Sequence, residues 1–235
     1  MKKTLLIFSL ILLTSCAELQ QIATNLPQLE NETLGPLDFS SGLKEALNKG
    51  VENQVTKLAK EGGFYLNESI KIPFPSELIK VDNGLRKIGL GKLSDEGVKM
   101  LNSAAEDAII TAIPIITKAI SDMSIQDAKN IVLGHESAAT VYLNRKTNAD
   151  LTAKLEPIIK NSFAKVGADK IWNNLITKYN AIPFTSDVNA DLTDYTTKKT
   201  LDGVFSMISV EEKNIRTNIG ARTSTLLQKV FAMQD

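Results

Sequence analysis

Hydrophobic residues recur every three or four positions along almost the whole chain after residue 41. The first such segment is followed by Gly62-Gly63 and carries its apolar side chains at Leu43, Leu47, Val51, Val55 and Leu58. Side chains three and four residues apart lie on the same side of an α-helix, so this spacing predicts helices that bury one face. The pattern therefore predicts an all-α domain with almost no strand.

Prolines, glycines and capping residues divide this pattern into eight to ten helices. Pro114 and Pro157 are expected to kink or divide their helices, because proline removes a backbone hydrogen bond and clashes with the preceding turn. Residues 64–75 carry two prolines and predict an extended crossover, with a strand-like piece as one possibility. The predicted helices cover about 41–61, 76–88, Ser94 to beyond Pro114, 125–133, 136–147, 149–166, 168–180, 190–208, 210–218 and 221–233.

Several short motifs mark individual helix ends. The segments Ser124–Asp127 and Ser209–Glu212 have the form of capping boxes, in which a hydroxyl and a carboxylate satisfy free backbone N–H groups. Glycine adopts the left-handed conformation after a helix at no steric cost. We therefore expect helix ends at or just before four glycine positions, namely Gly62-Gly63, Gly89, Gly134 and Gly167.

The N-terminal residues have the pattern of a lipoprotein signal. Lys2 and Lys3 precede an apolar run from Leu5 to Leu13, and Leu13-Thr14-Ser15-Cys16 has the form of a lipobox. The apolar run is too short to cross a bilayer of about 30 Å at 1.5 Å per residue, which favours a cleaved signal over a membrane-spanning helix. We predict a signal peptide over 1–15, a flexible tether over 16–40 and a helical domain over 41–235.

Cys16 is the predicted lipidation site. Its thiol would carry a diacylglyceryl thioether, and the α-amine freed by cleavage would take a further acyl chain such as palmitate; two or more chains anchor a protein stably. The expected partner is thus a membrane, reached through the N-terminal lipid. Ala17, in place of the aspartate that retains many lipoproteins in the inner membrane, predicts the outer membrane with the domain facing the periplasm, and cell-surface display is the alternative.

The charge composition bears on which classes of partner the protein can bind. The chain has 27 basic and 27 acidic residues, and loss of Lys2 and Lys3 leaves 25 against 27, a net charge of about −2. This balance leaves no basic excess to follow a nucleic-acid backbone, so we predict no nucleic-acid partner. The single cysteine allows no disulfide within the chain, and the core alone must hold the domain together.

Motifs for cofactors and metals are missing from the sequence. His135 is the single histidine, and the spacing of a helical zinc site fails because position 139 is alanine. The chain has neither a Gly-x-Ser-x-Gly elbow nor a glycine-rich phosphate loop. We predict no cofactor, no metal and no catalytic residue, and we lean against an enzyme.

Charged residues next to small residues in the predicted helices are the remaining candidates. We expect Glu106, Asp127 and Arg145 to form one partly buried polar network, because neighbouring alanines would let their helices approach closely. The alternative is that these charges line a ligand site between helices. Two further pairs, Asp194 with Lys198 and Glu212 with Arg216, have the i,i+4 spacing of helix-surface ion pairs.

Eight short blocks then occur in a characteristic order: Gly42–Leu47, Gly63–Tyr65, Ile72–Pro75, Asn102–Glu106, Met123–Lys129, Ala138–Leu143, Leu201–Phe205 and Lys229–Phe231. Together they resemble the bacterial envelope family known as domain of unknown function 4197, over residues 41–235. The resemblance implies one helical domain behind a secretion signal or lipobox in Gram-negative bacteria. It transfers no activity, substrate or catalytic residue, and it leads us to expect small or acidic residues where this chain has His135.

Three classes of function are compatible with these observations. A non-enzymatic interaction or scaffold module of the cell envelope, which binds another envelope protein, needs only a tethered helical surface. A binder of a lipid or other apolar ligand would use space between proline-kinked helices. An enzyme would need several of the embedded carboxylates to converge on a cleft, with raised pKa values.

Overall fold

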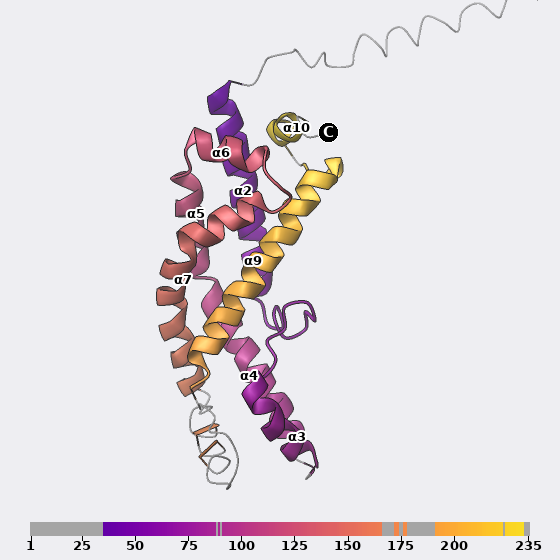
Figure 1. Cartoon of the computed structure of the whole chain (residues 1–235), viewed down its shortest axis with the longest axis vertical. Helices are drawn as coiled ribbons and strands as arrows, with labels where there is room; N and C mark the ends of the chain where they lie inside the picture. The colour runs from indigo at the N-terminus through magenta and orange to yellow at the C-terminus, as the bar shows by residue number, and fades with distance from the viewer. Residues whose placement is uncertain are drawn as a thin grey trace, which may run out of the picture. The chain divides into compact units, whose positions relative to one another are not determined.

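The computed structural model describes residues 35–87, 89, 91–165, 172–173, 176–177, 191–222 and 224–232. These residues form helices joined by turns and extended segments, without a strand, which confirms the all-α prediction. The elements labelled in Figure 1 and the two 3-10 turns are α2 (Pro36–Leu58), η1 (Ser76–Leu78), α3 (Ile79–Lys87), α4 (Gly91–Ile109), α5 (Ala112–Ser121), α6 (Ile125–Val132), α7 (Ala138–Lys165), α9 (Thr193–Thr217), η2 (Ile219–Ala221) and α10 (Thr225–Phe231).

Two long helices, α7 and α9, form the centre of the domain. They pack more extensively against each other than any other pair of helices, and α7 also contacts α4, α5 and α6 (Figure 1). The other long helix, α2, packs against α5, α6, α9 and α10. The side chains that α7 presents to these neighbours are fully buried at Leu143, Leu151, Leu155 and Ile159.

The two prolines act differently. Helix α4 ends at Ile109 and α5 begins at Ala112, so Pro114 lies in the first turn of a new helix, where its missing N–H costs nothing. The predicted division at Pro114 is confirmed. Helix α7 is a single helix where the sequence predicts two, at 136–147 and 149–166, because Leu143 and Leu151 on either side of the predicted break are both fully buried. Pro157, expected to kink its helix, lies inside α7 on the exposed side. Burial on the opposite side of this helix outweighs the cost of about 3 kcal/mol for an interior proline.

Helix α9 is also longer than predicted. It runs without interruption from Thr193 to Thr217, so the helices predicted at 190–208 and 210–218 are one, and Ser209 is not a cap. The carboxylate expected to complete that box, on Glu212, bonds to another helix instead. A local capping motif is thus overridden by a tertiary contact.

Other boundaries agree more closely. Gly62 and Gly89 have φ angles of 80° and 81° just after α2 and α3, and Gly134 follows α6, as predicted. Gly167, most of the helix predicted at 168–180 and the tether up to residue 34 lie outside the described residues.

Two helices begin earlier than expected. Helix α2 begins at Pro36, so residues 36–40, predicted as tether, belong to it; proline is favourable in the first helical turn. Ser94 does not cap α4, which begins at Gly91, because the Ser94 hydroxyl is buried and bonded to Asp82. Residues 64–75 form turns and an extended segment, as the two prolines predict.

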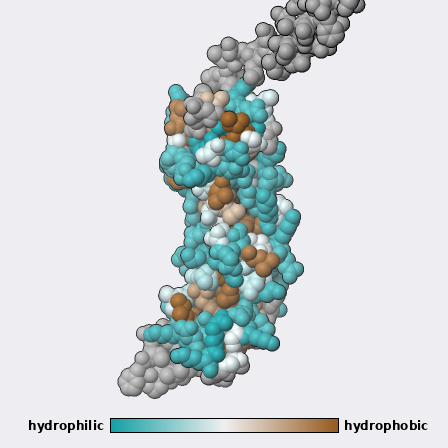
Figure 2. Space-filling model, turned by 90° about the vertical axis from the view of Figure 1, so that its right-hand side faces the viewer, coloured by the Kyte–Doolittle hydropathy of each residue, from teal (hydrophilic) through white to brown (hydrophobic). Residues whose placement is uncertain are grey.

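The surface turned to the viewer in Figure 2 is mostly hydrophilic. Hydrophobic residues appear on it as separate spots between polar ones. This face therefore presents no continuous apolar patch. Hydrophobic residues that are exposed singly are normal at protein surfaces.

Candidate functional site

The three residues expected to form one network lie in different surroundings. Asp127 on α6 and Arg145 on α7 both lie near Tyr142, whose pKa is raised mainly by burial, raised further by Asp127 and lowered by Arg145. Arg145 is exposed on the surface of α7. Glu106 on α4 is buried and bonds to the backbone after α2. The structure therefore does not join these charges in one buried network.

Glu106 holds the turn that follows α2. Its carboxylate accepts hydrogen bonds from the backbone N–H groups of Gly62 at 3.1 Å, Phe64 at 3.0 Å and Tyr65 at 3.2 Å. Only 6% of Glu106 is exposed, so these three donors replace the water that a buried carboxylate needs. The role of this charge is to order the chain between α2 and α3.

Asn102, one turn before Glu106 on α4, completes this contact and was not singled out from the sequence as a functional side chain. Its side-chain oxygen accepts the N–H of Ile72 at 2.8 Å, and its nitrogen donates to the Ile72 carbonyl at 2.9 Å. The i,i+4 spacing places Asn102 and Glu106 on one face of α4, toward the crossover. The sequence signal that could have identified Asn102 is its position four residues before Glu106, next to the same small residues Ala104 and Ala105.

Asp127 closes the predicted capping box at the start of α6. The Ser124 hydroxyl accepts from the Asp127 N–H at 3.0 Å, and the Asp127 carboxylate accepts from the Ser124 N–H at 3.1 Å and from its hydroxyl at 2.7 Å. These hydrogen bonds from Ser124 are the main cause of a lowered pKa for Asp127. The capping box is confirmed, and it stabilises the charged form of this carboxyl.

A polar groove of about 400 Å³ lies beside Asp127, between α5, α6 and α7. Lys118 forms an ion pair with Asp122 at 2.6 Å at the end of α5, and the Lys146 ammonium lies 5.7 Å from the centre of the Tyr142 ring. The groove is large enough for a small ligand. The groove carries both positive and negative side chains, and most of them already interact with neighbouring residues. It therefore favours neither an anionic nor a cationic ligand.

A buried ion pair links α9 to two other helices. Arg216 donates to Glu212 at 2.8 Å, and 8% and 6% of these residues are exposed. The Glu212 carboxylate also accepts the backbone N–H groups of Ala139 and Thr140, both at 2.9 Å, at the start of α7. The Arg216 guanidinium donates to the carbonyl of Ile131 at 2.8 Å, near the end of α6.

This ion pair therefore joins the end of one helix to the beginning of the next. An acid at a helix N-terminus and a base at a C-terminus both complement the helix dipole. The i,i+4 spacing of Glu212 and Arg216 is visible in the sequence, but it suggests a surface pair. Their position one turn beyond Phe205 and Ile208, on the same face of α9, was the available sign of burial.

Arg222 extends the buried cluster to the last described helix. Only 2% of it is exposed, and it donates to the carbonyls of Ile215 at 3.1 Å and Arg216 at 2.9 Å near the end of α9. The guanidinium groups of Arg216 and Arg222 lie 5.5 Å and 5.9 Å from the ring centre of Phe231 on α10. The cluster thus positions α10 rather than leaving charges open to solvent.

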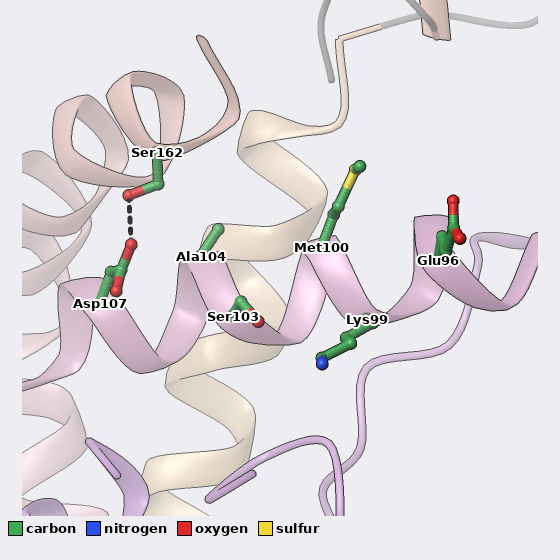
Figure 3. Close-up of a pocket in the computed structure, with 7 residues that line it drawn as sticks. All are labelled: Glu96, Lys99, Met100, Ser103, Ala104, Asp107 and Ser162. Carbon is green, nitrogen blue, oxygen red and sulfur yellow. Dashed lines mark hydrogen bonds between the residues drawn. The ribbon is translucent and has the colours of Figure 1, made fainter. Parts of the chain in front are cut away.

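A second pocket, of about 260 Å³, lies between α4 and α7 (Figure 3). Met100 and Ala104 line it from α4, and the Ser162 hydroxyl on α7 donates to the Asp107 carboxylate at 3.0 Å. Pockets for drug-sized ligands usually measure about 300–1,000 Å³. This one is smaller, and two of its polar groups are already bonded to each other.

The described residues contain no group of three histidine, cysteine, aspartate or glutamate side chains placed to hold a metal ion. His135 is exposed, and its Nδ1 accepts the N–H of Ser137 at 3.3 Å. No helix in the described part of the chain is both long enough and apolar enough to span a membrane. Cys16 lies outside the described residues.

The comparison with protein families identifies the family of this chain. Searches among curated proteins and among solved structures found no similar protein. A family model described as "Protein of unknown function (DUF4197)" matches residues 33–232, which include all the described helices. The chain therefore belongs to the DUF4197 family of proteins of unknown function.

Proposed function

We propose that this protein is a lipid-anchored module of the bacterial cell envelope that acts by binding another envelope protein and not by catalysis. The observation that carries the proposal is the motif Leu13–Cys16 behind Lys2, Lys3 and an apolar run, followed by 18 residues before the described domain begins at Gly35. Such a chain would hold a helical surface close to a membrane.

The use of the buried charges supports a binding role. Among the described residues, Glu106 and Glu212 are the buried carboxylates, and each accepts hydrogen bonds from backbone N–H groups that hold the fold together. Asp127 and Asp191 have lowered pKa values, caused mainly by hydrogen bonds from Ser124 and Thr193. General acids need raised pKa values, so these carboxyls are poorly suited to acid catalysis near neutral pH.

Binding of an apolar ligand is the second candidate. It would use the pocket beside Met100 and Ala104, which is lined mainly by α4. Its volume of about 260 Å³ would accept part of an acyl chain and not a whole lipid. We therefore favour the interaction module.

Replacement of the proposed lipidation site tests the anchor. In Gram-negative cells that express the protein, we expect incorporation of a radiolabelled fatty acid into the wild type, which fractionates with the outer membrane. Cys16→Ser removes the thiol that would carry the lipid, so this variant should lose the label and accumulate as an uncleaved precursor. Ser15→Ala keeps the cysteine and a small residue before it, and should remain labelled.

Label retained in Cys16→Ser would refute lipidation at this residue. Protease treatment of intact cells then distinguishes the two faces of the outer membrane. Protection supports a domain that faces the periplasm, whereas digestion supports display on the cell surface. Chemical cross-linking in intact cells, followed by mass spectrometry, should yield the same protein partner from replicate wild-type cultures and lose it with Cys16→Ser.

A further inference from the structure

Three large hydrophobic side chains are exposed around α6 and the end of α9. Ile125 is the first residue of α6 and Leu133 follows its last residue; they are 43% and 62% exposed, and Ile219 in η2 is 62% exposed. Arg216, three residues before Ile219, bonds to the carbonyls of Ile131 and Val132, so η2 lies beside the end of α6. We call Ile125, Leu133 and Ile219 the end cluster.

The end cluster lies at the end of the domain where α2 begins. Helix α6 packs against α2, and α5, which precedes α6, ends beside Lys44, whose ammonium donates to the carbonyl of Ser121 at 2.8 Å. Helix α10 reaches the same part of α2, with Leu226 against Gly42. Figure 1 shows α6 and α10 around the beginning of α2.

The length of chain before α2 places this end near the proposed anchor. Eighteen residues separate Cys16 from Gly35, and a tether of that length, if flexible as the sequence predicts, would have an r.m.s. end-to-end distance of about 20–25 Å. Helix α2, with 23 residues, is itself about 34 Å long. The beginning of α2 is therefore the part of the domain that a lipid on Cys16 would hold nearest to a bilayer.

The exposed side of α6 has a composition suited to a lipid surface. Ile125, Lys129 and Leu133 follow one another at spacings of four residues, and Lys129 is its exposed charged residue. Apolar side chains flanking a basic one are typical of helices that lie in the interface of an anionic bilayer. Asp127, the acid of α6, is turned into the capping box with Ser124.

We infer that the end cluster contacts the lipid headgroup region of the membrane, so that the domain stands on the end formed by α2, α6 and η2. The contact rests on the proposed lipid anchor and adds an orientation to it. The opposite end, formed by α3 and the beginning of α4, then projects away from the membrane (Figure 1). That end is the one available to a protein partner.

Spin labels on the lipidated full-length protein test this orientation. Cys16 is the only cysteine of the chain, so a cysteine introduced elsewhere is the single free thiol once Cys16 carries its lipid. The protein is reconstituted in vesicles of phosphatidylethanolamine and phosphatidylglycerol, and nitroxides are attached to Leu133→Cys and Ile219→Cys. Leu66→Cys is the matched control, because Leu66 is 75% exposed and lies beyond the far end of α2.

Relaxation by oxygen, which concentrates in lipid, is compared with relaxation by a water-soluble nickel chelate. We expect the ratio of oxygen relaxation to nickel relaxation to be several-fold higher for the labels at 133 and 219 than for the label at 66. Flotation of the vesicles is measured on the same samples. Protein that does not float would refute the anchor together with this orientation, whereas floating protein with three equally water-exposed labels would refute the orientation alone. Labels that are water-exposed on vesicles but immobilised in native outer membranes would also overturn it, in favour of a protein contact.

Discussion

At the residue scale, the ion pair between Glu212 and Arg216 illustrates how burial changes the value of a charge. Arg216→Met should lower the free energy of unfolding by about 3–5 kcal/mol, because it leaves the Glu212 carboxylate buried without its counter-charge. The double variant Glu212→Gln, Arg216→Met should recover part of this loss, since glutamine can still accept a hydrogen bond from the start of α7. Urea unfolding of the three proteins measures both effects.

Lys198→Met is the matched control for this experiment. Lys198 and Asp194 form an i,i+4 pair on the same helix at 2.8 Å, but both side chains are 68% exposed. Exposed substitutions of this kind usually change stability by less than about 0.5 kcal/mol. Equal losses for Lys198→Met and Arg216→Met would mean that burial does not decide the effect.

The lowered pKa of Asp127 predicts a pH-dependent contribution to stability. Hydrogen bonds from Ser124 favour the charged carboxylate in the folded state, so its stabilisation is complete above the unfolded pKa of about 3.9 and is lost as the pH falls through the lowered folded value. Asp127→Asn should therefore lower the stability most at neutral pH. The difference in stability between this variant and the wild type should shrink below about pH 4. Thermal melts across the acidic and neutral pH range measure this difference.

Ser124→Ala provides the control for Asp127. It removes the hydroxyl whose hydrogen bond is the main cause of the lowered pKa of Asp127. Loss of this N-cap side chain should also lower the free energy of unfolding by about 0.5–2 kcal/mol. In this background, Asp127→Asn should have a smaller and less pH-dependent effect. A difference in stability between the wild type and Asp127→Asn that stays constant with pH would contradict the assigned role of the capping box.

At the scale of elements, two glycines should respond to the same substitution with opposite signs. A Cβ on Gly42 would lie 2.5 Å from Leu226 Cγ and 3.3 Å from Val230 Cγ2, so Gly42→Ala should push α10 away from α2 and destabilise the protein. Gly84 in α3 has open space around it, and Gly84→Ala should stabilise by about 0.5–1 kcal/mol through helix propensity. Urea unfolding distinguishes these outcomes, and stabilisation by Gly42→Ala would show that the two helices do not pack closely.

At the scale of the whole molecule, the described helices should unfold together. The central helices α7 and α9 pack against each other and both contact α4, which carries Glu106. They are also joined to each other by the Glu212–Arg216 pair, through the bonds from Glu212 to the start of α7. Glu106→Gln and Arg216→Met should therefore shift one common transition to lower temperature. Fluorescence of the single tryptophan, Trp172, and helical circular dichroism should give the same midpoint for each variant, and separate midpoints would indicate two independently stable parts.

Those features of the fold that depend on a few neighbouring residues could be predicted from the sequence. The helical class follows from the spacing of apolar residues, the division before α5 from Pro114, the start of α6 from Ser124 and Asp127, and the turns after α2 and α3 from Gly62 and Gly89. Each arises within one or two turns of backbone, so local steric and hydrogen-bonding rules are sufficient.

The tertiary structure alone decided which signals prevail and which charges are buried. Helix α7 continues through Pro157 because buried side chains hold both of its halves, and α9 continues through Ser209 because Glu212 bonds to Ala139, 73 residues earlier in the chain. The partners of Glu106 lie 41–44 residues away. Spacing along one helix shows that two charges are neighbours, but the cost or benefit of a charge depends on desolvation by segments distant in sequence, which is set only when the helices pack.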